Sequence, residues 1–445
     1  MATDAKPAAV EFDPGGFSSF RFLARELSAD GRVTLRYALD DTVTFLEEFD
    51  LPVAGAISAE DRRRLEGPLS LLHWVAGVSY FKTAIPAAVS CETGAPPAAV
   101  ADLLEALYSE GLGEFAYSNH LRELPRPRFP RASAGAVPAA PPPPSSAHAS
   151  PRRVLVPVGG GKDSAVALEI VRRSGLELAL FSIGEAPAIA GTIARAELPH
   201  LLVRRRLDPG LARLNSSGAL NGHVPVTAIV ACAAVLTAAL HGFDSVAMAN
   251  ERSASSGNLR WDRIEVNHQF SKGLAAERLM RAALAELAIA RAFARLERYH
   301  GVFTSCNAVF RSDPDERAES WCCDCPKCRF VFLMLAPFSD PAHLRGIFGR
   351  DLLEDEGQFE GFALLSGSAG PKPFECVGEE QESIAAIRML AADPRWSTHP
   401  VVARLAEEVL PRHPPDAAET AVLALEDDHE VPAALLADVR ALLGA

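Results

Sequence analysis

Apolar and polar residues alternate through residues 17–50, near the start of the chain. This period of two is typical of strands with one buried face, so we predict an antiparallel hairpin or meander there. Ser58, with Asp61 three residues later, is typical of a capped helix start, and residues 98–109 have the apolar spacing of a second helix. Residues 1–124 are therefore expected to form an α+β domain.

The pattern changes after residues 125–152, which are rich in proline and small polar residues. Such a composition buries little apolar surface, so this stretch is predicted to be a linker. From Val154 onward, short apolar runs alternate with segments of helical spacing. Strands are predicted at 154–158, 176–183, 201–203 and 245–249, and helices at 164–174 and 226–240.

This alternation predicts the fold class. Strands and helices in turn indicate an α/β domain with a doubly wound parallel sheet, which binds its ligands at the carboxyl ends of the strands. We assign this domain to residues 153–340. Residues 341–445 are predicted to be mainly helical, with a glycine-rich loop from Ser366 to Gly378 that could close over a site.

Composition and charge exclude several classes of function. The formal net charge of −13 over 445 residues argues against a general nucleic-acid binder, which needs a basic surface. Residues 1–16 lack the apolar segment of a signal peptide. The longest apolar stretch, Val224–Leu240, contains a proline and is shorter than the roughly 20 residues of a membrane span. We therefore expect a cytoplasmic protein with neither a membrane nor a nucleic-acid partner, and the pattern does not indicate an oligomeric state.

The most informative motif follows the strand predicted at Val154–Val158. It consists of Gly159, Gly160, Gly161, Lys162, Asp163 and Ser164, and a predicted helix begins within it. Glycines let the backbone approach an anion, and the first N–H groups of a helix have no intrahelical acceptor, so this order suits phosphate. Asp163 could bind Mg²⁺ and Ser164 could donate its hydroxyl to phosphate. The alternative is a glycine-rich turn without a ligand.

This motif resembles the S-G-G-x-D-S loop of the PP-loop ATP pyrophosphatases, which cleave ATP to AMP and diphosphate. Gly159 stands where that family usually has serine. The resemblance implies a sheet of the PP-loop, HUP-like type, with ATP phosphates held by the backbone of Gly160 to Lys162. It also implies that adenine lies at the end of the next strand, at Phe181 and Ser182.

Five of the eight cysteines lie between Cys306 and Cys328. Cys322, Cys325 and Cys328 could supply three thiolates from one knuckle, with Cys306 as the fourth and Cys323 left over. Four sulfurs suit a closed, structural Zn²⁺ site. The arrangement resembles the four-cysteine zinc site of the 7-cyano-7-deazaguanine synthases. The alternative is a group of reduced, unligated thiols.

A third group of polar residues follows the strand predicted at 245–249, at Asn250, Glu251, Arg252 and Ser253. Arg252 could bind a substrate carboxylate. His268 and Lys272 are four residues apart and would share one face of a helix, where they could act as acid and base. The alternative is that His268 packs or caps and Lys272 is solvated.

Several motifs together resemble the family of UDP-N-acetyl-α-D-muramoyl-L-alanyl-L-glutamate epimerases. They are Gly113–Tyr117, Gly159–Ser164, Asn250–Ser253, Asn267–Lys272, Trp321–Phe332 and Lys372–Glu379. The resemblance implies an isomerase of peptidoglycan and cell wall biosynthesis. It would use ATP and Mg²⁺ to convert the terminal L-Glu of UDP-MurNAc-L-Ala-L-Glu to D-Glu, releasing AMP and diphosphate. The N-terminal domain would recognise the UDP-sugar, and Lys372 would contact the diphosphate of its UDP group.

The chemistry of these residues fits such a reaction, with Asp163, Arg252, His268 and Lys272 as the catalytic candidates. Adenylation would turn the α-carboxylate into a neutral mixed anhydride, and this change makes the adjacent C–H bond more acidic. Cys306 would be a proton donor only if it bound no metal. Two alternatives stay open: another PP-loop adenylating enzyme (an amide or nitrile synthase, or a nucleobase-modifying thiolase), and a non-catalytic, zinc-stabilised nucleotide sensor.

Overall fold

The computed structural model divides the chain into two compact units. The first unit contains residues 1–147 and 203–236, and the second contains residues 148–202 and 237–445. The predicted domain borders at 124, 152 and 340 remain predictions. Within the predicted domain 153–340, residues 203–236 cluster with the first unit. The structure describes residues 12–132, 152–251, 259–261, 264–273, 276, 283–284, 297–310, 317–370, 372–373, 377–414, 436–437 and 439–441.

The first unit is built on the predicted antiparallel meander, which is confirmed. Strands β1 (Ser19–Leu27), β2 (Arg32–Leu39) and β3 (Val43–Asp50) pair in succession. β4 (Ala88–Cys91) adds to β1 in parallel, and the end of β7 (His200–Arg206) adds to β3 in antiparallel register. The strand order in this unit is thus β4-β1-β2-β3-β7.

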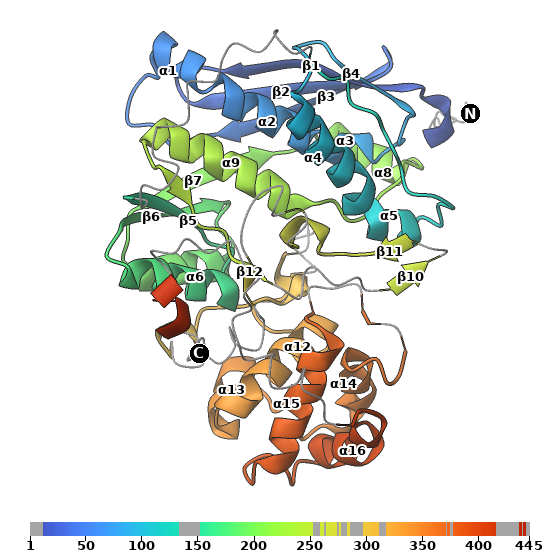
Figure 1. Ribbon diagram of the computed structural model, residues 1–445, viewed down its shortest axis with the longest axis vertical. Coiled ribbons are helices and arrows are strands. Elements are labelled where there is room, and N and C mark those ends of the chain that lie inside the picture. The colour runs from blue at the N-terminus through green and yellow to red at the C-terminus, as the bar shows by residue number, and fades with distance from the viewer. Residues whose placement is uncertain are drawn as a thin grey trace, which may run out of the picture. The chain divides into compact units, whose positions relative to one another are not determined.

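Helices cover one face of this meander (Figure 1). Ser58 caps the first of them by accepting a hydrogen bond from the Asp61 N–H group, as the sequence predicts. Buried tyrosine hydroxyls join sheet and helices, since Tyr37 donates to the carbonyl of His73 and Tyr108 to that of Trp74. The helices of the unit are α1 (Ala59–Arg64), α2 (Glu66–Ala76), α3 (Val78–Phe81), α4 (Ala98–Ser109), α5 (Gly113–Ser118) and α8 (Gly210–Ser216).

The second unit begins with the predicted strand, glycine loop and helix. β5 (Arg153–Pro157) pairs in parallel with β6 (Glu177–Ile183) on one side and β8 (Ser245–Val246) on the other. Helix α6 (Lys162–Arg173) follows β5, and α7 (Pro187–Ala196) follows β6. The α/β class is confirmed, but the strands of the protein are mixed rather than all parallel. β7, which we predicted as a third parallel strand, lies next to β6 in the strand order, and its end also pairs with β3 in the opposite direction.

Shorter elements connect this part to the C-terminal helices. α9 (Val226–His241) precedes β8 and contains the border between the units at residues 236 and 237. β9 (Asn250–Glu251) pairs with β12 (Ala283–Leu284), and β10 (Leu259–Trp261) pairs with β11 (Ile264–Val266). Apolar residues at helical spacing over 274–299 predict a long helix, but Ala283–Leu284 forms β12, and most of the range lies outside the described residues.

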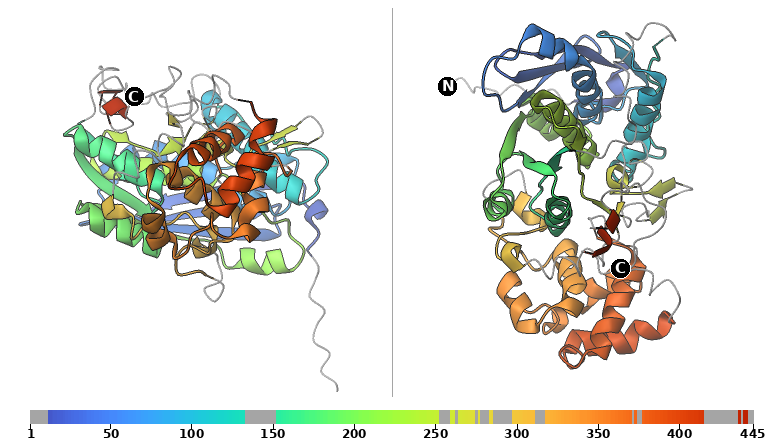
Figure 2. Two further views of the ribbon diagram at one scale, coloured as in Figure 1. Left: turned by 90° about the horizontal axis from the view of Figure 1, so that it is seen from below. Right: turned by 60° about the vertical axis from the view of Figure 1, so that its left-hand side comes forward.

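The C-terminal region is mainly helical, as predicted, and its helices form a bundle (Figures 1 and 2). α12 packs against α14 and α15, and α16 packs against both of these helices as well. Trp396 is completely buried in this core. Among the described residues, no helix has the length and apolar character needed to cross a membrane. The helices are α12 (Pro326–Leu335), α13 (Pro341–Phe348), α14 (Phe359–Leu365), α15 (Glu380–Ala392) and α16 (Pro400–Glu408).

Candidate functional site

The glycine loop joins β5 to α6, and two of its glycines are required by close contacts. Gly160 has a φ of +80°, and a Cβ atom there would lie 2.8 Å from the backbone nitrogen of Ile189 in α7. Gly161 is the N-cap of α6, and a Cβ atom there would lie 2.9 Å from the Ser305 hydroxyl. Gly159 has open space on its Cβ side. The loop is thus fixed on its inner side and open at its start, where an anion could approach.

The three residues after the glycines form the first turn of α6. Lys162 has a side chain that is only 1% exposed, and its ammonium group lies 2.5 Å from a carboxylate oxygen of Asp163. Asp163 is partly exposed, so its second oxygen is available to a cation. The Ser164 hydroxyl, predicted to contact phosphate, instead donates to the carbonyl of Gly161 at 2.9 Å. In this geometry Ser164 supports the loop and its proton is not free for a ligand.

The predicted adenine residues lie at the end of β6, where they support the loop. Phe181 is completely buried, and its carbonyl accepts a hydrogen bond from the Val158 N–H group at 2.8 Å. The Ser182 hydroxyl is buried too and lies 2.9 Å from Nε2 of His200. Burial lowers the pKa of His200, which favours the neutral ring. The Phe181 ring is therefore enclosed in the core and not exposed at this strand end.

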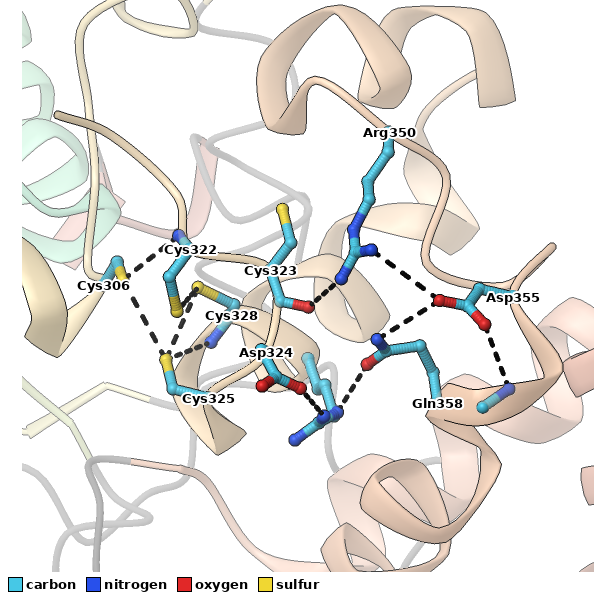
Figure 3. A network of polar contacts seen from close by, with 11 residues as sticks. Cys306, Cys322, Cys323, Asp324, Cys325, Cys328, Arg350, Asp355 and Gln358 are labelled. Atoms are coloured by element: carbon cyan, nitrogen blue, oxygen red, sulfur yellow. Dashed lines mark hydrogen bonds and ion pairs between the residues drawn. The ribbon is translucent and has the colours of Figure 1, made fainter. Parts of the chain in front are cut away.

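The four predicted metal ligands lie together in the second unit, with one donor atom of each within 4.8 Å of the others (Figure 3). The Sγ atoms of Cys325 and Cys328 are 3.5 Å apart, those of Cys322 and Cys328 3.7 Å, and those of Cys306 and Cys325 4.0 Å. A tetrahedron with metal–sulfur bonds of about 2.3 Å has sulfur–sulfur edges of roughly 3.8 Å. The donor set and its size therefore fit Zn²⁺.

Backbone N–H groups donate to two of these sulfurs. Cys325 is the N-cap of α12, and its sulfur accepts a hydrogen bond from the Cys328 N–H group at 3.4 Å. Cys306 accepts one from the Cys322 N–H group at the same distance. Hydrogen bonds with the Cys325 and Cys328 thiols hold the pKa of Cys306 well below its ordinary value. The pKa of Cys328 is raised because its hydrogen bond with Cys306 favours the thiol form.

Cys323 lies in the same knuckle but outside this group. Its thiol donates to the carbonyl of Phe348 at 3.1 Å and is buried. The backbone of Cys323 has a φ of +59°, and its carbonyl accepts a hydrogen bond from Arg350. This left-handed residue turns the knuckle so that its two neighbouring cysteines face the group while its own side chain faces the helices.

The predicted acid–base pair lies in a turn rather than on an α-helix. Phe270–Lys272 is a single turn of 3₁₀-helix, and His268 precedes it. The expectation that His268 and Lys272 share one helical face is therefore wrong. The Gln269 N–H group bonds to the Asn267 side chain at 2.8 Å and replaces the helical pattern.

The other predicted substrate residues are placed as follows. Asn250 and Glu251 form β9, while Arg252 and Ser253 lie outside the described residues. Lys372, expected to contact the UDP diphosphate, is buried, and its ammonium group donates to the carbonyl of Gly378 at 3.0 Å. This bond joins the middle of the predicted glycine-rich loop to its C-terminal end.

Two arginines at the end of β7 form ion pairs inside the first unit. Arg205 pairs with the completely buried Glu47 at 2.5 Å, and Arg206 pairs with Asp50 of the same strand, β3. Burial raises the pKa of Glu47, and the adjacent guanidinium of Arg205 opposes that rise. These ion pairs fix β7 on β3.

Lys82 in the first unit is a candidate that the sequence analysis missed. It ends α3, is only 5% exposed, and its ammonium group donates to the side-chain oxygen of Asn221. The loop around Asn221 is held by Asn119, at the end of α5, at 2.9 Å. Burial lowers the pKa of Lys82 to about 8. A lysine after an apolar helix looks like an ordinary cap, so no sequence signal indicated its burial.

Replacing Lys82 tests this buried charge by its pH dependence. Below pH 8 both states are protonated and the folded state bears the full cost of burial. Between pH 8 and 10.5 the unfolded chain binds a proton that the folded protein lacks, so the stability of the wild type rises with pH. We expect Lys82→Met to be about 3 kcal/mol more stable than the wild type at pH 7 and equally stable near pH 10.5. Urea unfolding at several pH values measures this difference, and a constant difference would contradict the interpretation.

Glu114 is a second missed residue, although its motif was noticed. One oxygen of its carboxylate accepts a hydrogen bond from Ser118 at 3.0 Å, and the other is buried without a partner among the described residues. A carboxylate oxygen of Glu114 lies within 4.8 Å of a ring nitrogen of His223 in the same unit. The sequence signal that could have indicated Glu114 is its acidic side chain within the otherwise apolar motif Gly113–Tyr117.

Comparison with known proteins places the chain in one family over almost all of its length. Residues 11–294 match the family model of the MurL N-terminal domain, and residues 302–420 match that of the MurL C-terminal domain. The chain is 44% identical over 414 residues to the UDP-N-acetyl-alpha-D-muramoyl-L-alanyl-L-glutamate epimerase of Salinispora tropica, covering 88% of each protein. It is 41% identical over 451 residues to the protein of that name from Xanthomonas oryzae pv. oryzae, covering 97% of this chain and 98% of the relative.

A third relative of the same name, from a Micromonospora species, is 45% identical over 405 residues, covering 86% of this chain and 88% of the relative. No solved structure matches the chain. Matches to both MurL domains in the order expected define a two-part MurL protein. The chain belongs to the UDP-N-acetyl-alpha-D-muramoyl-L-alanyl-L-glutamate epimerase family.

Proposed function

We propose that this protein is an ATP-dependent epimerase of peptidoglycan biosynthesis. It converts the terminal L-Glu of UDP-N-acetylmuramoyl-L-alanyl-L-glutamate to D-Glu. The observation that carries the proposal is membership of the epimerase family over most of the chain, together with a glycine loop at the start of a helix. Because the substrate is a nucleotide-linked precursor and the clustered thiols need reducing conditions, we place the reaction in the cytoplasm.

ATP solves a specific problem of this reaction. Removing the Cα proton beside an ionised carboxylate would put a second negative charge on adjoining atoms. The α-carboxylate attacks the α-phosphorus of ATP, which forms the acyl-adenylate and releases diphosphate. The carbonyl of this anhydride, which no longer carries the charge of the carboxylate, accepts the electrons of the C–H bond when a base removes the proton. Return of a proton to the opposite face and hydrolysis by one water molecule then give the D-Glu product and AMP.

The glycine loop is the proposed ATP site, of the PP-loop type. Gly159 is open to an anion, Gly160 and Gly161 permit the close packing of the loop, and the first N–H groups of α6 have no intrahelical acceptor. The free oxygen of Asp163 would hold Mg²⁺, which would offset the charge of the leaving diphosphate. The buried Lys162 holds Asp163 in place for this role.

The remaining roles are assigned by chemistry. Cys306, Cys322, Cys325 and Cys328 would hold a structural Zn²⁺. His268 and Lys272 are proposed for the two proton transfers, because both can carry a proton and both lie in one short turn. Arg252 is proposed to bind the substrate carboxylate, with Asn250, Glu251 and Ser253 beside it. Lys372 is proposed to contact the UDP group once its loop rearranges, since it now bonds within the loop.

The proposal is tested by incubation in D₂O with ATP, Mg²⁺ and the L-Glu substrate. The D-Glu product should carry one deuterium at Cα, because the proton that is returned comes from exchangeable groups. AMP should accumulate with product. A matched substrate, in which the terminal α-carboxylate is an amide, should give neither AMP nor label, because the carbonyl next to Cα then carries no carboxylate oxygen to attack ATP.

Two results would contradict the proposal in different ways. AMP formation without deuterium at Cα would indicate an adenylating enzyme with another acceptor. Deuterium incorporation at an undiminished rate without ATP would show that the carboxylate needs no activation. In the second case the epimerase activity would stand and the adenylate would be wrong.

A further inference from the structure

A short extended segment, residues 303–306, runs beside the glycine loop in the second unit. The Thr304 N–H group donates to the carbonyl of Gly160 at 3.1 Å. The Cys306 N–H group donates to Oγ1 of Thr304 at 3.2 Å. Because Cys306 belongs to the cysteine cluster, this segment joins that cluster directly to the glycine loop.

Ser305 lies between these two anchors, at the start of α6. Its hydroxyl occupies the place where a side chain at Gly161 would project, 2.9 Å from an ideal Cβ. The φ of Gly161 is −91°, which any residue adopts, so the backbone itself does not require glycine there. The absence of a side chain at Gly161 therefore makes room for the Ser305 hydroxyl at the helix N-terminus.

The Ser305 hydroxyl could supply the contact to phosphate that no serine of the glycine loop itself makes. Gly159 stands where related loops have serine, and the Ser164 hydroxyl already donates to the carbonyl of Gly161. Ser305 is half-buried, and its hydroxyl makes no hydrogen bond to any residue that the structure describes. A hydroxyl proton held beside the N–H groups of a helix start is suited to a phosphate oxygen.

We propose that Ser305 is a phosphate-binding residue of the glycine loop and that the metal-loaded cysteine cluster positions it. The inference rests on the proposed function, since it assumes that ATP binds this loop. The Ser305 hydroxyl donates to an oxygen of the diphosphate part of ATP. A metal bound to Cys306 would hold the adjacent Ser305 in its place beside Gly161. The cluster, although remote from the reacting carbon, thereby contributes to nucleotide binding.

The first test measures the affinity for an ATP analogue whose α,β-bridging oxygen is replaced by a methylene group, with Mg²⁺ present. We expect Ser305→Ala to bind it about ten- to a hundredfold more weakly than the wild type, because a hydrogen bond to a charged group is lost. The matched control is Asn307→Ala, on the other side of Cys306, whose side chain is exposed. This control should bind as the wild type does, and both variants should retain zinc.

The outcomes separate this inference from the proposed function. If Ser305→Ala binds the analogue as tightly as the wild type, Ser305 is not a phosphate ligand, while the ATP loop itself stands. If the wild type does not bind the analogue at all, the proposed nucleotide loop is wrong. A loss of affinity in Asn307→Ala equal to that in Ser305→Ala would show a general disturbance of the segment and would also overturn the inference.

A second test addresses the link to the metal with a spectroscopic signal. Co²⁺ in a four-sulfur site has visible absorption bands that respond to small changes in geometry. We expect the analogue to shift these bands in the Co²⁺-substituted wild type, and to shift them much less in Ser305→Ala at saturating analogue. Bands that stay unchanged in a wild type with bound analogue would overturn the positioning role of the cluster.

Discussion

Asp163→Asn is expected to abolish AMP formation and epimerisation together, with a fall in both rates on the order of a thousandfold. The substitution keeps the size of the side chain but removes the charge that would hold Mg²⁺ at the start of α6. The same group faces the buried ammonium of Lys162 at 2.5 Å. Because diphosphate cannot leave without its charge being offset, loss of this carboxylate should affect the first chemical step. Measuring AMP release and deuterium incorporation in one assay tests both rates.

The stability of this variant separates the catalytic role from a structural one. Removing the carboxylate takes one charged partner from Lys162, whose side chain is 1% exposed, so we expect a lower free energy of unfolding. The double variant Lys162→Met, Asp163→Asn removes both charges and should recover much of that stability. It should remain inactive. A double variant that regained AMP formation would show that Asp163 only neutralises the lysine.

The local parts of the fold were predictable because their signals lie within a few residues. The strand before Gly159, the helix after it and the capped helix at Ser58 each combine a hydrophobic period with a boundary residue. The pairing of β7 with β3 was not predictable, because it joins segments more than 150 residues apart and is fixed by ion pairs such as Arg205 with Glu47. The run Arg204–Arg206 has the same sequence pattern whether its side chains bind phosphate or pair with acidic residues of a neighbouring strand.

The candidate site divides in the same way. Three of the four clustered cysteines could be predicted to lie together, because only two residues separate each from the next and this places them in one knuckle. The turn at His268 could not, since a spacing of four suggests a helix whereas the Asn267 side chain bonds locally and ends the helical pattern. Ser305 next to Gly161 and Lys82 next to Asn221 are tertiary contacts across more than 130 residues, and neither has a motif.

Loss of one of the four proposed metal ligands is expected to destabilise the C-terminal bundle strongly. Structural zinc in zinc-finger peptides is bound with an apparent free energy of about 10 kcal/mol or more, which is comparable with the whole stability of a domain. Cys328 is completely buried at the start of α12, the helix that packs against α14 and α15. We therefore expect Cys328→Ser to lose the metal and to unfold the C-terminal bundle at a much lower temperature than the wild type.

Cys323→Ser is the matched control, because the same substitution is made in the same knuckle at a sulfur outside the cluster. Its thiol donates to the carbonyl of Phe348, and a serine hydroxyl can donate to that carbonyl too. We expect Cys323→Ser to keep one zinc per chain by elemental analysis and to unfold close to the wild type. A chelator should lower the unfolding temperature of the wild type and of Cys323→Ser, and leave that of Cys328→Ser unchanged. If both variants keep metal, or both lose it, the assignment of the four ligands is wrong.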